Sequence, residues 1–541
     1  MKFKHSIYFA LLLVLIFFTF ACGSSTDKAG NSAMEEKTEA VEATPLTTKV
    51  EVTGGTIEGV EQEGILTYKG IPFAAPPVGD LRWKAPAPVQ PWTGIKKADA
   101  FCDACMQEAN AMGNTAPVNE DCLYLNVWTP AEKENEKLPV IYWVHGGGYS
   151  GGSTSTPMYD GTGFAKKGVV MVAVAYRLGP FGFLAHPELS AESGNGSGTY
   201  GIQDMIAGLK WVKDNIAKFG GDPSNVTIFG HSAGGAAVSL LAATPLTKGL
   251  FHRAICMSGG TFTPLKTLNK TGIGLSMPSL RLAEQNGEEF LKKLEANDIK
   301  AARALSAEDI QTALTGDMRF RPAADGYVIS NDLYSLYEDG NFNYTPILLG
   351  HTSDEMGSFG RTQDITSAEF EKQIREQYGP DADAILKTYP HSTDAEATRS
   401  SKDIRNDSSF CWNTWTWSRL QSRNGKMKAF QYYFDYHPGS PDGGSGHGSD
   451  VPYAFQTLGG PAGEPGQEDL NLSDMISSYW INFARSGDPN GAGMPEWPSF
   501  SEENSEVMVF DEDPGAEPLP ILDRLKAIDS YFSRLRNEAN Q

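Results

Sequence analysis

The chain has little positive charge for its length. Its 541 residues include 45 lysines and arginines against 67 aspartates and glutamates, which gives a formal net charge of −22. Such a charge repels nucleic acid and anionic surfaces, so we expect no nucleic-acid partner. The region after residue 48 also lacks an internal repeat and any linker-like stretch long enough to separate domains. These absences favour one large domain over residues 49–541.

Cysteine is scarce as well. The six cysteines are Cys22, Cys102, Cys105, Cys122, Cys256 and Cys411. Cys102 and Cys105 have the spacing of a redox or zinc motif, but no second cysteine pair and no histidines at metal-binding spacing accompany them. We therefore expect no metal site. In an exported protein, nearby cysteines are candidates for disulfides, and their pairing is open at this point.

The N-terminal apolar run is too short to span a membrane. It extends from Ile7 to Ala21, follows the basic start Met1-Lys-Phe-Lys-His5 and ends at Cys22. This pattern is typical of an export signal over residues 1–22. Cys22 lies where bacterial lipoprotein signals carry their acylated cysteine, although Thr19-Phe-Ala21 lacks the leucine usually found there. We expect an exported protein held at a membrane only by a lipid on Cys22. The alternative is cleavage near Ala21 and secretion.

The segment after this signal predicts no packed structure. Residues 23–48 contain no aromatic side chain and are rich in Glu, Thr, Ala, Lys and Ser. A segment of this composition cannot bury enough apolar surface to fold, so we expect a tether.

A strand, a sharp turn and a helix are predicted around Ser232. The β-favouring run Val226–Phe229 leads into Gly230-His-Ser-Ala-Gly234, and the helix-compatible run Ala236–Ala242 follows. Glycines on both sides of the serine let neighbouring chains approach a strained backbone closely. The pattern predicts a nucleophile elbow with Ser232 as the nucleophile. The N–H of Ala233, at the helix start, is a candidate oxyanion donor. The alternative is a turn that only caps a helix.

Three glycines follow a predicted buried strand, Leu138–Val144, in the string His145-Gly-Gly-Gly-Tyr149. They allow the backbone to approach a reacting group with its N–H groups free to point at it. We therefore expect Gly147 and Gly148 to contribute to an oxyanion hole. Another buried strand, Val169–Ala175, lies between this string and the serine, as the alternating order of an α/β protein requires.

A set of strings in this chain occurs in a familiar order. They are Glu120–Asn126, His145–Tyr149, Tyr176–Leu184, Phe219–Asn225, Gly249–Ile255 and Phe483–Asn490. Together they resemble type-B carboxylesterases, in the cholinesterase-like branch of the α/β-hydrolases, from about Glu51 to Phe500. The resemblance implies an α/β-hydrolase fold, with a large, mostly parallel central sheet flanked by helices and long insertions over the active-site face. It also implies a cofactor-independent serine hydrolase that cleaves small-molecule carboxylic esters through an acyl-enzyme.

The catalytic acid and histidine of α/β-hydrolases follow the serine in the sequence. A strand candidate, Thr345–Gly350, precedes both Asp354 and Glu355, and position alone leaves both carboxylates as candidates. The resemblance selects Glu355, the second carboxylate of the family's Asp-Glu-Gly string. Met356 replaces the glycine of that string here.

The histidines after this acid are His391, His437 and His447. His437 follows the predicted strand Lys428–Tyr436, whereas His447 lies in a glycine-rich loop that resembles the family's histidine loop. We expect His447 to be the general base and His437 to pack at the strand end. His145 and His231 flank the site and are expected to shape it rather than to act as bases.

The resemblance also bears on the disulfide and the substrate. Cys105 and Cys122 match the two cysteines of the family's early disulfide, with Cys102 as the competing partner. The loop between them, Met106–Asp121, has no Trp, Tyr or Phe, and therefore no cation–π platform for a choline group. His231 stands where the family usually carries glutamate, which removes an anion near the serine. We expect neutral esters to be preferred over cationic ones.

Trp412, Trp415 and Trp417 allow two interpretations: core packing of a helix, or a pocket wall for aromatic or bulky acyl groups. Two other functions also remain open. The same triad would serve a lactonase or an amidase, and a non-catalytic adhesion protein can share the fold, although such a protein is expected to lose the serine, the histidine or the glycines. The sequence does not specify the oligomeric state.

Overall fold

The computed structural model describes residues 44–108, 111, 114–266, 276–315, 318–360, 363–438, 443–459 and 463–539. These residues belong to one compact unit that begins at Ala43. The predicted export signal, Cys22 and most of the predicted tether lie outside the described residues. No helix in the described ranges is long and apolar enough to cross a membrane.

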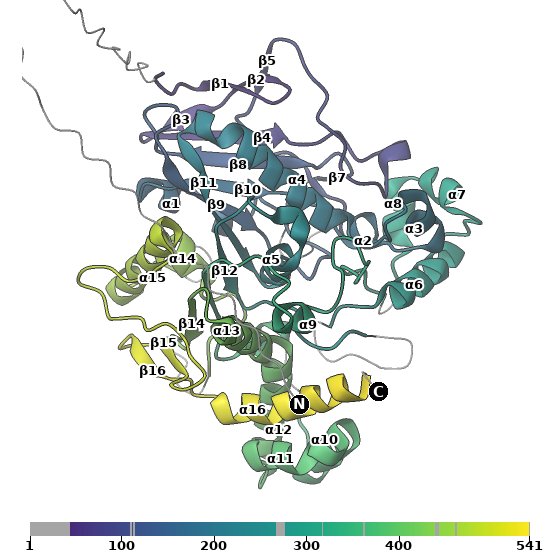
Figure 1. Cartoon of the computed structure of the whole chain (residues 1–541), viewed down its shortest axis with the longest axis vertical. Helices are drawn as coiled ribbons and strands as arrows, with labels where there is room; N and C mark the ends of the chain where they lie inside the picture. Colours follow the sequence, from purple (N-terminus) through teal and green to yellow (C-terminus); the bar gives the residue numbers. More distant parts are fainter. Residues whose placement is uncertain are drawn as a thin grey trace, which may run out of the picture. The chain divides into compact units, whose positions relative to one another are not determined.

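A mixed, mostly parallel sheet runs through the unit (Figure 1). Strands β9 to β15 are parallel to their neighbours within this group. Antiparallel strands β8, β4 and β3 extend one edge, and β16 extends the other. The sheet confirms the large, mostly parallel architecture that the sequence predicts. In order across the sheet, the strands are β16(Gly515–Pro518), β15(Glu506–Phe510), β14(Ala429–Phe434), β13(Ile347–Thr352), β12(Arg253–Met257), β11(Gly221–His231), β9(Leu138–Val144), β10(Val170–Val174), β8(Tyr124–Thr129), β4(Ile65–Pro72) and β3(Val60–Gln62).

Alternating side chains of the parallel strands pack against helices on the two faces of the sheet. In β9, Val140, Tyr142 and Val144 enter the core that contains α4 and α5. Ile141 and Trp143 enter the opposite core, with α1, α14 and α15, which lie together at the left of Figure 1. A strand buried on both faces needs an uninterrupted apolar sequence, and β9 has one. These helices are α4(Tyr200–Asn215), α5(Ala233–Ala243), α1(Thr162–Lys166), α14(Val451–Phe455) and α15(Gln467–Ser486).

Two long insertions follow β12 and β13. Both contribute to the cavities around Ser232, because Met277 and Arg321 come from the first insertion and Phe359 from the second. This is the excursion over the active-site face that the resemblance implies. The helices of the first insertion are α6(Leu280–Lys293), α7(Ile299–Arg303), α8(Ala307–Thr312) and α9(Leu333–Glu338), and those of the second are α10(Ser367–Tyr378), α11(Ala382–Thr388), α12(Asp394–Asn406) and α13(Trp412–Asn424).

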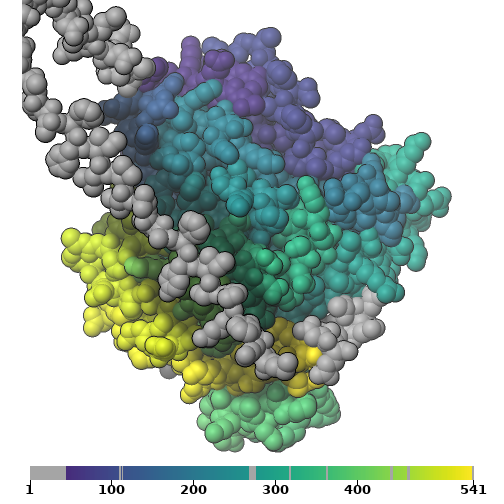
Figure 2. Space-filling model, viewed as in Figure 1, coloured from purple at the N-terminus to yellow at the C-terminus, as the bar shows by residue number. Residues whose placement is uncertain are grey.

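The remaining elements surround this central layer. Figure 2 shows the strands near residues 49–97, in purple, and helices α10 to α12, in green, at opposite ends of the described unit. A small sheet is formed by β1(Lys49–Val52), β2(Gly55–Glu58) and β5(Ile95–Lys97), and another by β6(Ala104–Cys105) and β7(Val118–Asn119). The other helices are α2(Gly179–Phe183), α3(Pro187–Ser193) and α16(Leu522–Ala539).

The predicted elements that carry the site match the structure closely. The strand predicted at Leu138–Val144 is β9 itself, and the one predicted at Val226–Phe229 lies inside β11. The strand predicted at Thr345–Gly350 is displaced, because β13 starts and ends two residues later. This difference matters for the site, because β13 ends only three residues before Glu355.

Candidate active site

Ser232 occupies a sharp turn between β11 and α5. Its backbone has φ 57° and ψ −123°, a region that L-residues rarely adopt. A Cβ atom added at Gly230 would lie 2.4 Å from the carbonyl carbon of Gly234, and one added at Gly234 would lie 2.1 Å from the carbonyl oxygen of Val144. Side chains therefore cannot fit on either side of the turn, which gives the geometry of a nucleophile elbow.

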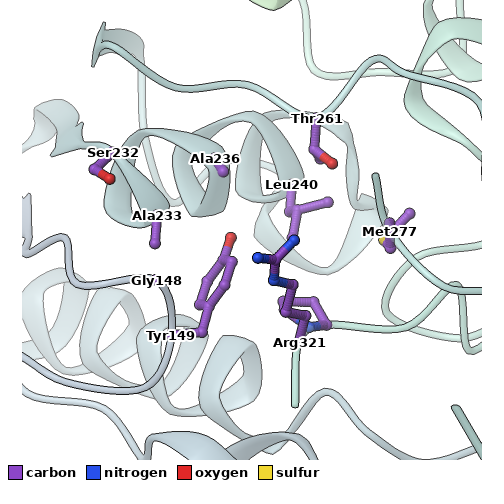
Figure 3. A pocket seen from close by; sticks show the side chains of 10 residues that line it. Gly148, Tyr149, Ser232, Ala233, Ala236, Leu240, Thr261, Met277 and Arg321 are labelled. Atoms are coloured by element: carbon purple, nitrogen blue, oxygen red, sulfur yellow. The ribbon is translucent and has the colours of Figure 1, made fainter. Parts of the chain in front are cut away.

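The oxyanion loop, residues 145–152, packs against this elbow. A Cβ at Gly146 would lie 3.0 Å from the Cβ of Ser232. Gly147 and Gly148 have positive φ angles of 113° and 63°, and Gly148 and Ala233 line the same pocket as Ser232 (Figure 3). Two of the predicted oxyanion donors, Gly148 and Ala233, therefore lie in the pocket of the serine.

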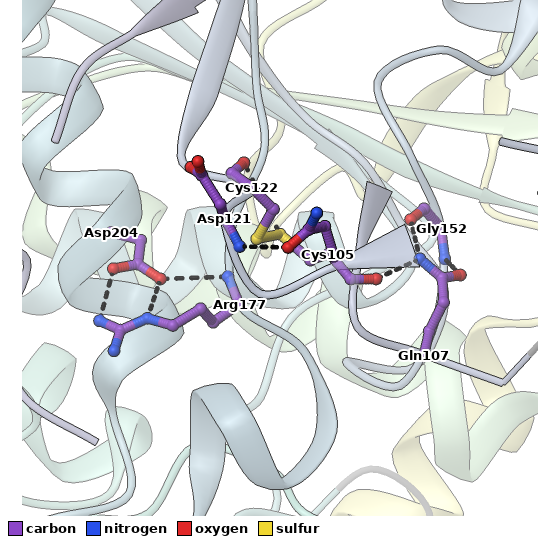
Figure 4. The surroundings of a disulfide bond; sticks show 8 residues. Cys105, Gln107, Asp121, Cys122, Gly152, Arg177 and Asp204 are labelled. Carbon is purple, nitrogen blue, oxygen red and sulfur yellow. Dashed lines mark hydrogen bonds and ion pairs between the residues drawn. A yellow bond between two sulfur atoms is a disulfide. The ribbon is translucent and has the colours of Figure 1, made fainter. Parts of the chain in front are cut away.

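The disulfide loop contacts the far end of the oxyanion loop through Gln107 (Figure 4). The structure joins Cys105 and Cys122 in a disulfide, as the resemblance implies. The amide of Gln107 donates to the carbonyl oxygens of Cys105, at 3.0 Å, and Gly152, at 2.8 Å. Its side-chain oxygen accepts from the N–H of Gly152 at 2.9 Å. Gln107 is buried, and its role was not predicted from the sequence, because only the fold brings the two loops together.

Glu355 and His447 contact each other directly. Glu355 begins the short 3-10 helix Glu355–Phe359 after β13, and His447 lies in the histidine loop, residues 443–450, after β14. The Nδ1 atom of His447 hydrogen-bonds to Oε2 of Glu355. The other carboxylate oxygen accepts from the N–H of Thr352 at 2.9 Å. This arrangement orients the imidazole and leaves Nε2 for the substrate side.

The electrostatics keep the carboxylate of Glu355 ionised. The side chain is fully buried, and burial alone raises the pKa of a carboxyl group. The charge of His447 and the hydrogen bonds to Glu355 outweigh this effect, so that the pKa of Glu355 lies below its ordinary value. A buried carboxylate of this kind stabilises an imidazolium on its partner histidine.

Asp354, the other carboxylate candidate, points elsewhere. Its carboxylate forms an ion pair with Lys402 at 2.8 Å. Its backbone N–H donates to the carbonyl oxygen of Ser445 at 2.9 Å, which joins the end of β13 to the histidine loop. Asp354 precedes the 3-10 helix without capping it through its side chain. Asp354 thus bonds to Lys402 and to the histidine loop.

The histidine loop brings the His447 ring close to the elbow. The ring centroid lies 4.6 Å from that of His231, the residue before Ser232. Phe359 and Phe410 also pack against His447, with centroids at 5.0 and 4.6 Å. Within the described residues, Nε2 of His447 is buried and has no hydrogen-bond partner. The hydrogen bond to Ser232 is thus not made here, and such bonds are often long in unliganded enzymes.

The other histidines near the site lack the features of a general base. Burial lowers the pKa of His145 to about 4, and the ring stacks on Tyr176 at 4.5 Å. The pKa of His231 is also lowered, by burial first and by the charge of His447 second. His437 bonds locally to the carbonyl oxygen of Asp435. Burial therefore favours the neutral form of the first two, and their role in shaping the site stays a prediction.

The tryptophan cluster of α13 belongs to the core. Trp412, Trp415 and Trp417 are all buried, with no more than 3% of each residue exposed. Trp417 packs against Phe262 at 5.6 Å, and Trp412 packs against Phe532 at 4.4 Å. The interpretation of this cluster as core packing fits the structure, and none of the three tryptophans lines the pocket that contains Ser232.

No group of three or more His, Cys, Asp or Glu side chains in the described parts of the chain could hold a metal ion. The geometry instead assembles a strained serine, a carboxylate–histidine pair and a glycine loop. Comparison with known proteins decides the family: the model of the carboxylesterase family matches residues 46–520. The chain belongs to the carboxylesterase family.

Individual carboxylesterases agree with this assignment along most of their length. The chain is 38% identical over 479 residues to a fumonisin B1 esterase of Sphingopyxis macrogoltabida, covering 85% of this chain and 86% of the relative. It is 33% identical over 473 residues to the para-nitrobenzyl esterase of Bacillus subtilis, covering 85% and 94%. A solved carboxylesterase of Geobacillus stearothermophilus superposes with a TM-score of 0.77 at 32% identity, covering 89% of this chain and all of that one. The protein is a carboxylic-ester hydrolase with the α/β-hydrolase fold.

Proposed function

We propose that this carboxylesterase cleaves esters through an acyl-enzyme on Ser232, with His447 as general base and Glu355 as its orienting acid. His447 accepts the proton of the Ser232 hydroxyl as Oγ attacks the ester carbonyl. The N–H groups of Gly147, Gly148 and Ala233 stabilise the oxyanion. The alcohol leaves with a proton from His447, water attacks the acyl-enzyme by the reverse proton route, and the carboxylic acid is released.

The observation that carries this proposal is the hydrogen bond between Glu355 and His447 beside the elbow. This bond pairs His447 with a buried carboxylate. Within the described residues, Nε2 of His447 has no hydrogen-bond partner. His231, although nearer to Ser232 in sequence, is kept neutral by burial and so does not compete for this role.

A fluorophosphonate probe tests the nucleophile. We expect mass spectrometry of the labelled protein to locate the adduct on Ser232. Ser232→Ala should neither be labelled nor hydrolyse 4-nitrophenyl butyrate above the rate of the buffer. Because the side chain of Ser239 is buried in α5 and bonded to the carbonyl oxygen of Ala236, Ser239→Ala is a matched control that should keep its labelling. Labelling at another serine would contradict the mechanism.

Neutral esters are proposed to be better substrates than cationic ones. The described part of the disulfide loop offers no aromatic ring, and His231 replaces the anion that would attract a cationic alcohol. The test compares acetylcholine with 3,3-dimethylbutyl acetate, which has the same shape without the charge. Faster cleavage of acetylcholine would refute this part of the proposal. A lactone and an anilide in the same panel separate ester hydrolysis from lactonase and amidase activity.

The proposed location is the outer side of a membrane, reached through the export signal and a lipid on Cys22. Two or more acyl chains anchor a protein stably, at about 0.8 kcal/mol per buried CH₂ group. The full-length protein should fractionate with membranes until detergent is added, whereas Cys22→Ala should not be lipidated. An unmodified mature N-terminus in the soluble fraction would favour secretion instead.

A further inference from the structure

An arginine lies in the pocket of the nucleophile. Arg321, from the first insertion, lines the pocket that contains Ser232, Gly148 and Ala233. The same residue borders a larger cavity, of about 1350 Å³, that also reaches Gly147 and Gly148. Arg321 therefore lies where the wide cavity and the pocket of the serine adjoin.

In the described part of the chain, no carboxylate pairs with this arginine. Among the described residues, no carboxylate makes an ion pair or hydrogen bond with Arg321, and the ionisable groups that act on its pKa are Tyr149, which raises it, and Arg319, which lowers it. Burial lowers the pKa of its guanidinium, which nevertheless stays protonated at neutral pH. A partly buried cation without a counter-ion is costly unless a ligand supplies the opposite charge. The feature is notable in a chain with a formal net charge of −22.

A second polar group in the same pocket also lacks a partner. The hydroxyl of Tyr149 is buried and makes no hydrogen bond within the described residues, and only 7% of the residue is exposed. Figure 3 shows this hydroxyl and the guanidinium of Arg321 reaching toward the same space beside α5. The remaining walls are formed largely by apolar groups, including Ala236, Leu240 and Met277. Two donors that converge in an apolar pocket define a site for an acceptor group.

We propose that Arg321 and Tyr149 bind a carboxylate carried by the ester substrate, so that the enzyme selects esters with a second, free carboxyl group. An arginine fork matches a carboxylate with two charge-assisted hydrogen bonds, and the Tyr149 hydroxyl donates a third. This inference rests on the proposed function, since it assumes that Ser232 attacks the ester.

The carboxylate can belong to either half of the ester, and two matched pairs of substrates distinguish the halves. Monoethyl succinate carries it on the acyl side, and ethyl 4-methylpentanoate has an isopropyl group in the same place. 3-Acetoxypropanoate carries it on the alcohol side, and 3-methylbutyl acetate is its neutral counterpart. Initial rates by pH-stat titration give kcat/KM for each of the four esters.

We expect the wild type to prefer the carboxylate in at least one pair by tenfold or more. Arg321→Gln should lose at least tenfold of that preference, mainly through KM, while turnover of the neutral ester stays within about threefold. Arg321→Lys should recover part of the preference, because the charge returns without the fork. Tyr149→Phe should cost less than the loss of the arginine. Arg319→Gln removes the same charge from an exposed arginine two residues away and should leave the preference unchanged within twofold.

The outcomes separate the two proposals. Hydrolysis of both neutral esters with no preference for either carboxylate overturns the anion site and leaves the proposed function in place. Failure to hydrolyse any of the four overturns both. An equal loss of preference in Arg319→Gln and Arg321→Gln would show that the positive charge attracts the substrate through a long-range electrostatic field. That result also overturns the site. If Arg321→Gln does not fold, competitive inhibition of the wild type decides: succinate should inhibit cleavage of ethyl 4-methylpentanoate at least tenfold better than succinamide, and equal inhibition overturns the site.

Discussion

The oxyanion loop after β9 and the histidine loop after β14 both close on Ser232, but they are held by different means. The oxyanion loop is held by the fit of its backbone: a Cβ added at Gly147 would lie 2.0 Å from the carbonyl oxygen of Gly151. The histidine loop is held by polar side chains. Ser445 bonds to Ser353 and to the carbonyl oxygen of Tyr436, both at 2.8 Å, and Asp450 accepts a hydrogen bond from Tyr432 at 2.7 Å.

This difference determines which substitutions each loop tolerates. Added atoms should damage the oxyanion loop, where there is no space, and lost polar groups should damage the histidine loop, where buried donors and acceptors would be left unpaired. The reason is chemical, because a backbone N–H donor needs only a fixed position, whereas an imidazole must be oriented and must gain and lose a proton.

The largest effect is expected at His447. His447→Ala should lower kcat by a factor on the order of 10⁵–10⁶, since members of a catalytic triad act as a unit. His231→Gln, at the ring that packs against it, should cost less than about 100-fold, because no carboxylate among the described residues bonds to His231. Single-turnover kinetics of 4-nitrophenyl butyrate measures both. A larger loss in His231→Gln than in His447→Ala would mean that the base has been misassigned.

The next effect compares the two neighbouring carboxylates. Glu355→Gln should lower kcat roughly 10³–10⁴-fold, because an amide neither holds the tautomer nor stabilises the imidazolium. Asp354→Asn loses only the ion pair with Lys402, so its kcat should fall less than tenfold. Steady-state rates of the two variants, with melting temperatures as a check on folding, decide between them. The reverse order would assign the acid to Asp354.

A smaller loss is expected from an added methyl group in the oxyanion loop. Gly147→Ala combines a φ of 113° with the close approach to Gly151 and should displace the donors, lowering kcat about 10²–10³-fold. The methyl group of Gly148→Ala meets no atom within 4 Å. The only cost of this substitution is the backbone strain of a positive φ, so the variant should retain more activity. Equal losses would show that backbone conformation, and not space, limits this loop.

Removal of the disulfide should act on stability first. The pair Cys105→Ser and Cys122→Ser opens a loop of 17 residues, which should lower the free energy of unfolding by about 3 kcal/mol in the chain-entropy model. Because Gln107 joins this loop to Gly152, kcat should also fall a fewfold. Denaturant melts measure the loss of stability, and steady-state rates measure the loss of kcat. Cys256→Ser changes a free and buried cysteine outside the loop and is the control for both. Peptide mapping that links Cys102 to Cys122 would refute the pairing.

The smallest effect concerns the pH dependence of the histidine loop. Burial raises the pKa of Asp450 to about 7, despite the hydrogen bond from Tyr432. The folded protein therefore binds this proton more tightly than the unfolded chain does, and the stability it provides is lost as pH rises from about 4 to about 7. Asp450→Asn should remove this dependence. Unfolding curves at pH 5 and pH 8 test this prediction. The same change in unfolding free energy between these pH values in the wild type and in Asp450→Asn would contradict it.

The sequence determined the parts of this protein whose physics is local. Uninterrupted apolar runs predicted β9 and its neighbours, because a parallel strand buried on both faces cannot carry polar residues. Glycines around Ser232 predicted the elbow, because that turn has no space for side chains. With the help of the family resemblance, chain order was enough to propose Glu355 and His447, which the structure brings into contact.

The tertiary structure decided what depends on residues far apart in the chain. Gln107 lies 45 positions before its partner Gly152. Phe359 and Phe410 pack against His447 but belong to segments outside the histidine loop. No local sequence pattern could therefore identify these contacts. The tryptophans of α13 were ambiguous because a helix of that composition packs equally well in a core or along a pocket; packing against Phe262 and Phe532 settled it. Arg321 has no motif at all. The sequence does not distinguish an exposed arginine from one that lines the pocket of Ser232. Only the folding of the first insertion decides between these two positions.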